Sequence, residues 1–317
     1  MSKRAVVLGG AGLIGSHLCV KLLEEGYDVV CVDRRGLRES PLLRKIDNRG
    51  KFHYVKHDIT TPFEMVGDEL YNLVSPTEYG TNCDYIEDQY LISTGSMNAL
   101  HLATRGYSKV IYGSSDDVYN FEKLDIEYNS NKRFIAETKR FGESIHKAYH
   151  QKYQLDCRIA RIFSTYGSNA GLRDQHVIGK MIVNALNNQD IKIFGNGEQV
   201  RTFCWVEDMA DGLYRLMNAH TADRLITADL GSNTQISIRE LAELIISLTG
   251  SKSNIQHVSA RKDEPRYKIP NLKVATSQLY WEPTTSMHEG LMRTISYIEK
   301  ELSSIAMSQM SWVEIYG

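Results

Sequence analysis

The amino-acid sequence predicts an α/β fold, in which helices cover both faces of a mainly parallel sheet and a smaller lobe lies beside it. Short apolar runs alternate with helical stretches through the first half of the chain, and parallel strands need such crossover helices. The chain also has 317 residues, which is long enough to bury a substantial core.

The first 33 residues predict a strand, a glycine-rich turn, a helix and a second strand, which together form a βαβ unit. Residues 5–8 are the first strand. In the helix that follows, Ile14, Leu18 and Leu22 recur every four positions, so they share the face that packs on a sheet. The second strand, residues 29–32, leads into Asp33.

Later elements continue this alternation. Strands are expected where short apolar runs lie between helical segments, over residues 52–55, 70–74, 109–112 and 157–163. Residues 133–149 predict a helix, because their apolar positions follow helical spacing: Phe134, Thr138, Phe141, Ile145 and Tyr149. Past Gly167, helices are expected over 176–186, 238–248 and 287–301, with a turn at 195–197.

The change of pattern at Gly167 predicts two lobes. The larger, residues 1–166, would hold the sheet and bind the cofactor, and would also receive residues from 200 to 232. The smaller, mixed α/β lobe would comprise residues 167–199 and 233–317 and bind the substrate. Since no repeat or low-complexity linker separates them, the lobes are expected to share an interface.

Composition argues against several kinds of partner. The formal net charge is −2 and 24% of the residues are charged, so no basic surplus favours nucleic acid or an anionic membrane. No run of about 18 apolar residues occurs, and residues 5–8 are too short for the core of an export signal. The five cysteines are scattered singly, without the spacing of a metal site or a disulfide framework. We therefore expect a cytoplasmic protein with reduced thiols, no metal and a small-molecule partner.

A glycine-rich turn lies directly after the first strand and opens the first helix. Its sequence is Gly9-Gly10-Ala11-Gly12-Leu13-Ile14-Gly15. Glycines let the backbone approach a pyrophosphate, whose charge is favoured by the positive end of the helix. A plain glycine turn is the alternative, but the strand, the helix and an acid after the next strand all agree with a dinucleotide site. The expected fold is thus a Rossmann-type doubly wound sheet.

Asp33 indicates which dinucleotide is bound. It stands 18 residues beyond Gly15, where its carboxylate can accept hydrogen bonds from the adenosine ribose hydroxyls and repel a 2′-phosphate. This favours NAD over NADP. Arg34 and Arg35 follow immediately, and their guanidinium groups could instead bind such a phosphate or simply remain solvated.

Several further segments carry a resemblance to a known family. They are KHDIT at 56–60, SSDDVY at 114–119, RIARIF at 158–163, FGNG at 194–197 through RTF at 201–203, and WEP at 281–283. With the glycine turn, they resemble in order the extended short-chain dehydrogenase/reductases. Within that family, the sequence looks most similar to the UDP-glucuronate decarboxylases and the related nucleotide-sugar epimerases and dehydratases.

This resemblance implies an NAD-dependent enzyme that acts on a nucleotide sugar. In the family, NAD takes a hydride from C4 of the sugar, and the ketone permits epimerisation, elimination or decarboxylation. The base is the tyrosine of Tyr-x-x-x-Lys, whose lysine lowers the tyrosine pKa and holds the nicotinamide ribose. A serine or threonine steadies the substrate oxygen. Here the resemblance makes Ser115 that serine and Lys139 that lysine.

The resemblance also implies the remaining contacts. The cofactor-binding positions are Gly9, Gly12, Leu13, Ile14, Gly15, Asp33, Arg34, Asp58, Ile59, Val74, Ser75 and Lys139. The substrate-binding positions are Ser115, Ser164, Lys180, Arg201 and Arg266. Arg201 matches the arginine that contacts the nucleotide diphosphate in relatives, a contact that suits a planar guanidinium, although a plain surface arginine is the alternative. Lys268 is a further basic candidate for that pocket.

The chain departs from the family at the base. The tyrosine position, four residues before Lys139, falls on Ile135, which has no titratable group. A second Tyr-x-x-x-Lys begins at Tyr128, but it lies seven residues upstream, roughly 10 Å along a continuous helix. Tyr128, Tyr79 and Asp117 are therefore the alternative bases. Other positions vary as well: Asp117 replaces a glutamate of the decarboxylases, Ser164 and Lys180 replace asparagines, and Asn120 replaces a glycine.

Two functions follow. In the first, the chain is an active enzyme that oxidises a UDP- or GDP-linked sugar at C4 with an unusual base. In the second, it is a catalytically impaired protein that binds NAD and a nucleotide sugar in a structural or regulatory role. The joint presence of Ser115, Lys139 and Arg201 favours the enzyme. Because relatives pair through two helices per subunit, a homodimer through residues 93–103 and 133–149 is also implied.

Overall fold

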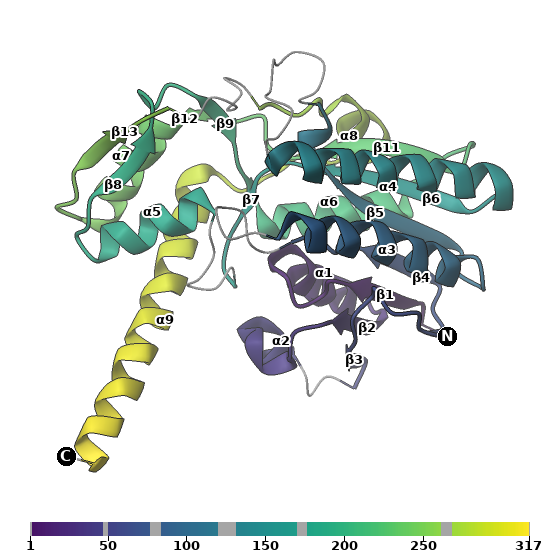
Figure 1. Cartoon of the computed structure of the whole chain (residues 1–317), viewed down its shortest axis with the longest axis horizontal. Coiled ribbons are helices and arrows are strands. Elements are labelled where there is room, and N and C mark those ends of the chain that lie inside the picture. Colours follow the sequence, from purple (N-terminus) through teal and green to yellow (C-terminus); the bar gives the residue numbers. More distant parts are fainter. Residues whose placement is uncertain are drawn as a thin grey trace.

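The structure, a computed structural model, describes residues 2–46, 50–76, 84–119, 131–169, 176–260 and 268–316, except for the side chains of residues 38, 131, 132 and 305–316. It confirms the predicted Rossmann-type α/β fold. A seven-stranded sheet carries helices on both faces, and a second group of helices and short strands lies beside it (Figure 1).

The seven strands are all parallel and lie in the order β3-β2-β1-β4-β5-β6-β11. β1 lies in the middle of the sheet. β2 and β3 follow on one side of it, and β4, β5, β6 and β11 follow on the other side. In such sheets, ligands bind beyond the carboxyl ends of the strands at the point of reversal, here between β1 and β4. The strands are β1 Arg4–Leu8, β2 Asp28–Asp33, β3 Phe52–Lys56, β4 Glu69–Asn72, β5 Lys109–Ser115, β6 Asp156–Ile162 and β11 Leu225–Leu230.

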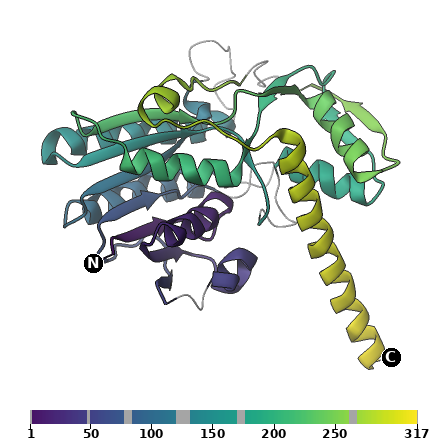
Figure 2. The same cartoon turned by 180° about the vertical axis from the view of Figure 1, so that it is seen from behind.

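Alternate side chains of each strand face two separate apolar clusters, because successive residues of a strand point to opposite faces. In β1, Ala5 and Val7 belong to the cluster formed with α1 and α6, whereas Val6 and Leu8 belong to the one formed with α3 and α4. Figures 1 and 2 show these two helix pairs on opposite faces. The covering helices are α1 Leu13–Glu24, α6 Val206–Asn218, α3 Tyr85–Ala103 and α4 Asn131–Tyr153, with the shorter α2 Pro41–Ile46 and α8 Lys273–Gln278.

A second apolar core lies in the smaller group, where α5, α7 and α9 pack together. Its helices are α5 Val177–Leu186, α7 Ile238–Thr249 and α9 Met287–Tyr316. Its paired strands are β8 Ile191–Phe194 with β13 Ile255–Val258, β9 Val200–Thr202 with β12 Gln235–Ser237, and β7 Thr165–Tyr166 with β10 Cys204–Trp205. The lobe boundaries remain a prediction. The position of β11, Leu225–Leu230, in the main sheet favours them, because residues 200–232 were expected to join the larger lobe.

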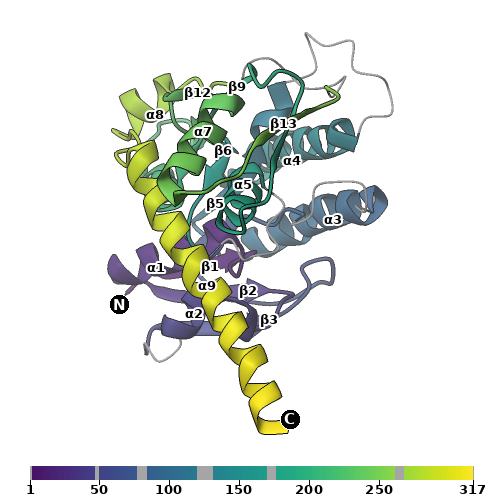
Figure 3. The ribbon, with the colours of Figure 1, turned by 90° about the vertical axis from the view of Figure 1, so that its left-hand side faces the viewer.

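α9 is longer than the helix predicted over residues 287–301, since it continues to Tyr316. Figure 3 shows it extending away from the second core toward the C-terminus. Within the described ranges, no helix combines the length and the apolar composition that crossing a membrane requires. The cysteines among these residues, Cys19, Cys31, Cys157 and Cys204, are all free and buried.

The ends of β4 and β5 also differ from the prediction. β4 stops at Asn72 instead of residue 74, whereas β5 continues past residue 112 to Ser115. The side-chain oxygen of Asn72 accepts the Val74 N–H at 3.3 Å, so it satisfies the backbone where the chain leaves the sheet. Residues 113–115 of β5 therefore extend beyond β4. We call residues 73–75 and 113–115 together the β4–β5 step; it lies at the carboxyl edge of the sheet.

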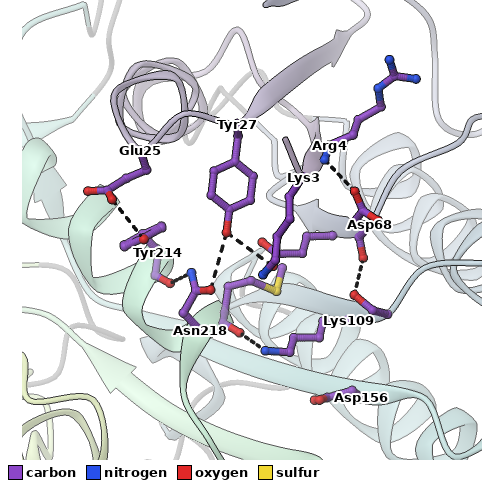
Figure 4. Close-up of polar contacts among 12 residues, drawn as sticks. Lys3, Arg4, Glu25, Tyr27, Asp68, Lys109, Asp156, Tyr214 and Asn218 are labelled. Carbon is purple, nitrogen blue, oxygen red and sulfur yellow. Dashed lines mark hydrogen bonds and ion pairs between the residues drawn. The ribbon is translucent and has the colours of Figure 1, made fainter. Parts of the chain in front are cut away.

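The opposite, amino-terminal edge of the sheet carries a polar cluster (Figure 4). Glu69, at the start of β4, has a buried carboxylate that forms an ion pair with the Lys3 ammonium at 2.9 Å. The Tyr27 hydroxyl lies 3.5 Å from both Glu69 and the side chain of Asn218. The cluster therefore connects the strands to the end of α6, and we assign it to stability because it lies away from the ligand edge.

Candidate functional site

The glycine turn between β1 and α1 leaves no room for side chains. Gly9 has a φ of +75°, and a Cβ there would lie 3.1 Å from the backbone of the loop after β4. A Cβ on Gly15 would lie 2.3 Å from the Gly9 carbonyl oxygen, and one on Gly12 would lie 3.2 Å from it. Leu13 and Ile14 begin α1 and contact the second apolar core. The turn thus combines a close-packed backbone with the positive end of a helix, which is the arrangement that binds pyrophosphate.

Asp33 is buried at the end of β2, and its carboxylate points toward the glycine turn. It accepts hydrogen bonds from the backbone N–H of Ala11 at 2.9 Å and of Arg35 at 3.0 Å. The Arg35 guanidinium also pairs with it at 3.4 Å, whereas Arg34 is exposed. A carboxylate and a guanidinium therefore lie together where the adenosine ribose is expected. Of the two arginines, Arg35 is the one that pairs with Asp33, and a cofactor contact of Arg34 remains a prediction.

The other expected cofactor residues lie in loops at the carboxyl ends of β3 and β4. Asp58 is exposed, and the N–H of Thr60 donates to its carboxylate at 2.9 Å, which lowers the pKa of Asp58. Ile59 is buried beneath α3. Val74 and Ser75 are half-buried in the β4–β5 step. These positions share the edge at which a doubly wound sheet binds its ligand.

Lys139 reaches from α4 into the β4–β5 step. Its side chain is buried, and its Nζ donates to the carbonyl oxygens of Gly113 at 2.8 Å and Val74 at 3.3 Å. The same atom lies 5.4 Å from the centre of the Tyr112 ring. Burial lowers the pKa of Lys139 to about 8. Ile135, one helical turn earlier, is also buried, so the residue four positions before this lysine contributes only apolar surface.

Ser115 ends β5 beside two carboxylates. Its Oγ lies 3.2 Å from Asp116 and 3.3 Å from Asp117, and the Lys268 Nζ pairs with these carboxylates at 2.9 and 2.6 Å. Burial raises the pKa of Asp116. Although burial alone would lower the pKa of Lys268, the two carboxylates raise it. Lys268 therefore remains a cation and joins an acid–base cluster at the end of β5, instead of standing apart as a diphosphate ligand.

A second polar network supports the segment that follows Ser115, the short helix η2 Asp116–Tyr119. Arg161 on β6 donates two hydrogen bonds to Glu143 on α4, both at 2.8 Å. Ser114 also donates to Glu143, at 2.7 Å. Arg161 donates to the Tyr119 hydroxyl, which in turn donates to Asp229, each at 2.7 Å. The network thus joins Ser114, two residues before η2, to α4, and Tyr119, at the end of η2, to β6 and β11.

The expected substrate residues lie on separate elements. Ser164 is half-buried just after β6, Arg201 is buried in β9, and Lys180 is exposed on α5. Three further candidates, Tyr79, Tyr128 and Arg266, lie outside the described residues. Direct contacts therefore group Ser115 with Asp117 and Lys139 with Val74, while the diphosphate and sugar contacts remain predictions.

Several charged residues of these networks were not singled out from the sequence, among them Asp116 and Glu143. Asp116 is adjacent to Ser115, so a run of two acids after the serine was the available signal. Glu143 follows Lys139 by four residues and therefore lies on the same face of α4. Both are buried, which distinguishes them from solvated surface acids.

The fold and the site together define an extended short-chain dehydrogenase/reductase, with its glycine turn, its acid at the end of β2, its serine at the end of β5 and its lysine within α4. Comparison with known proteins is more specific. The profile of the NAD dependent epimerase/dehydratase family matches residues 5–226. The chain belongs to this family.

Individual relatives agree with this assignment. UDP-glucuronic acid decarboxylase 1 of Danio rerio is 32% identical over 97% of this chain and 75% of the relative. UDP-glucuronic acid decarboxylase 3 of Arabidopsis thaliana is 33% identical over 91% of this chain and 86% of the relative. A UDP-glucuronic acid 4-epimerase from Bacillus cereus, solved in complex with UDP-glucuronic acid and NAD, has a TM-score of 0.80 at 23% identity, covering 94% of this chain and 99% of that one. This structural similarity supports the fold alone.

Proposed function

We propose that the chain is an NAD-dependent enzyme that modifies a nucleotide-linked sugar, beginning with oxidation at C4. The observation that carries the proposal is the placement of Lys139 and Ser115 at the β4–β5 step, at the edge where the glycine turn also lies. A ketone at C4 opens routes to epimerisation, dehydration, decarboxylation or simple dehydrogenation. Analysis of the sugar product separates these outcomes.

The residues present fit NAD. The glycine turn and the N-terminus of α1 would hold the pyrophosphate, and Asp33 would accept hydrogen bonds from the adenosine ribose. Asp33 is held in place by the Ala11 N–H, and its buried charge disfavours a 2′-phosphate, so we favour NAD over NADP. Asp58, Ile59, Val74 and Ser75 would line the remaining cofactor path. Bound there, the nicotinamide would supply the acceptor for the hydride of C4.

The cluster at the end of β5 would orient the sugar and move protons. Ser115 would donate a hydrogen bond to the sugar oxygen, since its hydroxyl lies at the carboxyl end of the strand. Asp117 lies 3.3 Å from that hydroxyl and can exchange a proton with it. Lys268 keeps positive charge beside both carboxylates, and so stabilises negative charge on the reacting groups.

We assign the nucleotide diphosphate to Arg201 and the sugar to Ser164, Lys180 and Arg266. A buried guanidinium suits a diphosphate, because its planar donors bind two oxygens at once. The names of the relatives favour a uridine nucleotide, and UDP-glucuronic acid is the first substrate to test; a GDP-linked sugar is the alternative. The free, buried cysteines favour the cytoplasm as its location.

The second candidate function is a protein that binds NAD and a nucleotide sugar without turning them over. It rests on Ile135, which is buried one turn before Lys139 and offers no group that could exchange a proton. In this case, the site would serve a structural or regulatory role.

Calorimetry and product analysis test both candidates. The purified chain should bind NAD and UDP. Incubation with NAD and a panel of UDP-, GDP- and dTDP-sugars should give a new sugar product by mass spectrometry, or absorbance of reduced cofactor. Silence over the whole panel, with binding intact, would establish the second function. No affinity for NAD would end the proposal.

A pair of glycine variants controls this test. Gly15→Ala should abolish NAD binding, because the added Cβ would lie 2.3 Å from the Gly9 carbonyl oxygen and 2.8 Å from the Gly10 Cα. Backbone atoms cannot move aside as a side chain can. Gly50→Ala should bind NAD as the wild type does, since a Cβ there meets nothing within 4 Å. Equal affinity of the two variants would show that the cofactor lies elsewhere.

A further inference from the structure

Lys139 carries a buried amine that pairs with no carboxylate among the residues that the structure describes. Titratable groups lie on each element that surrounds it: Tyr112 on β5, Glu143 and His146 on α4, Asp116 and Asp117 on η2, and Glu87 and Asp88 on α3. Arg161 and Ser114 bind Glu143, and Lys268 pairs with the two aspartates. None of these charges contributes to the lowered pKa of Lys139, whose cause is burial alone.

The hydrogen bonds of Lys139 match a neutral amine. The described groups offer its Nζ two acceptors, the carbonyl oxygens of Gly113 at 2.8 Å and Val74 at 3.3 Å. An ammonium carries three donors, whereas a neutral amine carries two donors and a lone pair. Two carbonyls therefore satisfy every N–H of the neutral form. The lone pair of the neutral amine then remains available to accept a proton, or a hydrogen bond from the hydroxyl of a substrate.

The neighbours of Lys139 hold this nitrogen in one place. Tyr112 lies beneath it, with the ring centre 5.4 Å from Nζ, and His146 stacks on the same ring at 4.6 Å. Both accepting carbonyls belong to the β4–β5 step, at the edge where the cofactor and sugar are proposed to meet. Position 135, one turn before Lys139, holds a buried isoleucine, which cannot take the proton instead. Asp117, the alternative base among the described residues, is held by the Lys268 ammonium at 2.6 Å.

We infer that Lys139 itself is the base of the first step, taking the proton of the sugar C4 hydroxyl on its neutral amine. An N–H bond would form at Nζ as the O–H bond breaks, and a C=O bond would form at C4 as the C4–H bond breaks, with NAD held at the glycine turn supplying the acceptor for the hydride. Lys139 leaves this step as an ammonium and returns the proton when the ketone is reduced. The inference rests on the proposed function. A lysine that titrates near pH 8 suits a base that works close to neutral pH.

The first test measures titration of Lys139 without cofactor or substrate. Its pKa of about 8 in the folded chain lies below the ordinary value of 10.5, so the unfolded chain binds more protons between these pH values. Wild-type stability should therefore rise with pH across this window relative to Lys139→Met, which has no charge. Lys139→Arg keeps its charge and should show no such rise. The exposed Lys192→Met serves as the matched control and should follow the wild type.

The second test uses turnover. The wild-type kcat should rise tenfold per pH unit below pH 8 and level off above it. Lys139→Met and Lys139→Arg should each lose at least about 100-fold, the usual contribution of a positioned base. A lysine that only holds the ribose would give a flat profile, and Lys139→Arg would then retain activity.

The possible outcomes separate the inference from the proposed function. A flat stability difference between wild type and Lys139→Met over pH 7 to 10 means that the amine stays charged, which overturns the inference. Turnover whose rate does not depend on pH would also overturn the inference, but it would leave the proposed function in place. If the wild type is silent and Ile135→Tyr turns over, the missing phenol was the base. If neither turns over, the proposed catalytic function fails.

Discussion

Arg161 and Glu143 form a largely buried ion pair beside the end of β5, where Glu143 also accepts a hydrogen bond from Ser114. Burying either charge without its partner would be unfavourable. The guanidinium binds the carboxylate through two hydrogen bonds at 2.8 Å, and the Glu143 side chain is 6% exposed. Removing one partner of such a pair costs more than the pair contributes, because the other charge is left in a poorly solvated place.

We predict that Arg161→Met lowers the free energy of unfolding by about 3 kcal/mol at pH 7, measured by urea titration. Methionine keeps the apolar stem of the side chain and removes the donors, so Ser114 remains as the described donor to Glu143. Arg105→Met is the control. The Arg105–Glu64 pair is exposed, and its loss should change stability by less than about 1 kcal/mol. Equal effects of the two variants would contradict the argument.

The effect of Arg161→Met should depend on pH. Burial would raise the pKa of Glu143, but the hydrogen bonds from Arg161 and Ser114 outweigh it and lower that pKa. The stabilisation is therefore complete above the ordinary glutamate value of 4.5 and is lost as the pH falls through the lower value of the folded state. The difference between wild type and variant should shrink in acid; a difference that grows there would assign the effect to packing.

The limit of sequence reasoning is clearest in the cluster around Ser115. Asp117 was identifiable from its place beside the serine, but Lys268 lies 151 positions further along the chain. No local spacing joins them, and only the folding of the second lobe against the sheet brings the ammonium to the carboxylates. Lys139 was found through its motif, yet its burial and its two carbonyl partners depend on where β4 and β5 end.

Helix α4 is seated on β5 through a close contact at Gly142. A Cβ on this glycine would lie 2.1 Å from the Tyr112 hydroxyl, and Tyr112 is almost completely buried. The helix can approach the strand this closely because position 142 has no side chain. The same contact places Lys139, one turn earlier on α4, over the Tyr112 ring.

Gly142→Ala should therefore destabilise the protein by about 1–3 kcal/mol, despite the better helix propensity of alanine. Thermal unfolding measures this. Ser144→Ala, at an exposed position of the same helix, should leave the melting temperature unchanged or slightly raised. If Gly142→Ala were as stable as Ser144→Ala, α4 would not be seated on Tyr112 as described.

Periodicity predicted the elements better than their ends. The two-residue alternation of β1 and the helical spacing within α1 follow from burial, which the sequence expresses directly. In α4, Phe141 fits the helical spacing but is 44% exposed. The end of β4 depends on one hydrogen bond, from the Val74 N–H to the Asn72 side chain, which no propensity encodes. The length of α9 was likewise underestimated, because residues 302–316 continue a helix without a stop signal at residue 301.

Two cores meet at the candidate site. Leu13 and Ile14, in the first turn of α1, contact the second core. The following turns of α1 pack in the cluster that this helix forms with α6 against the sheet. Lys268 comes from the segment before α8 and reaches η2 on the sheet. Ligand binding between cores allows one to hold the cofactor and the other the sugar nucleotide, and this division of roles remains a proposal for this chain.

The outer surface of α3 and α4 carries exposed apolar side chains, which favours an interface with a second copy of the chain. Ile86 and Tyr90 on α3 are 80% and 55% exposed, and Phe141 and Tyr153 on α4 are 44% and 50% exposed. The two helices pack side by side, so a symmetric contact made through them would cover exposed apolar side chains of both copies. The homodimer through residues 93–103 and 133–149 remains a prediction, and of these four side chains Phe141 lies within those segments.

We predict a homodimer at micromolar concentration by light scattering, and a monomer for the double variant Tyr90→Glu, Phe141→Glu, because two buried, unpaired carboxylates per subunit would oppose association. Tyr280→Glu is the matched control: Tyr280 is 82% exposed, and its carbonyl oxygen accepts from Arg215 on α6, on the other face of the sheet. This variant should remain dimeric, and all three proteins should bind NAD equally if their fold is intact. A wild-type monomer would refute the dimer, and a double variant that still dimerises would move the interface to another face.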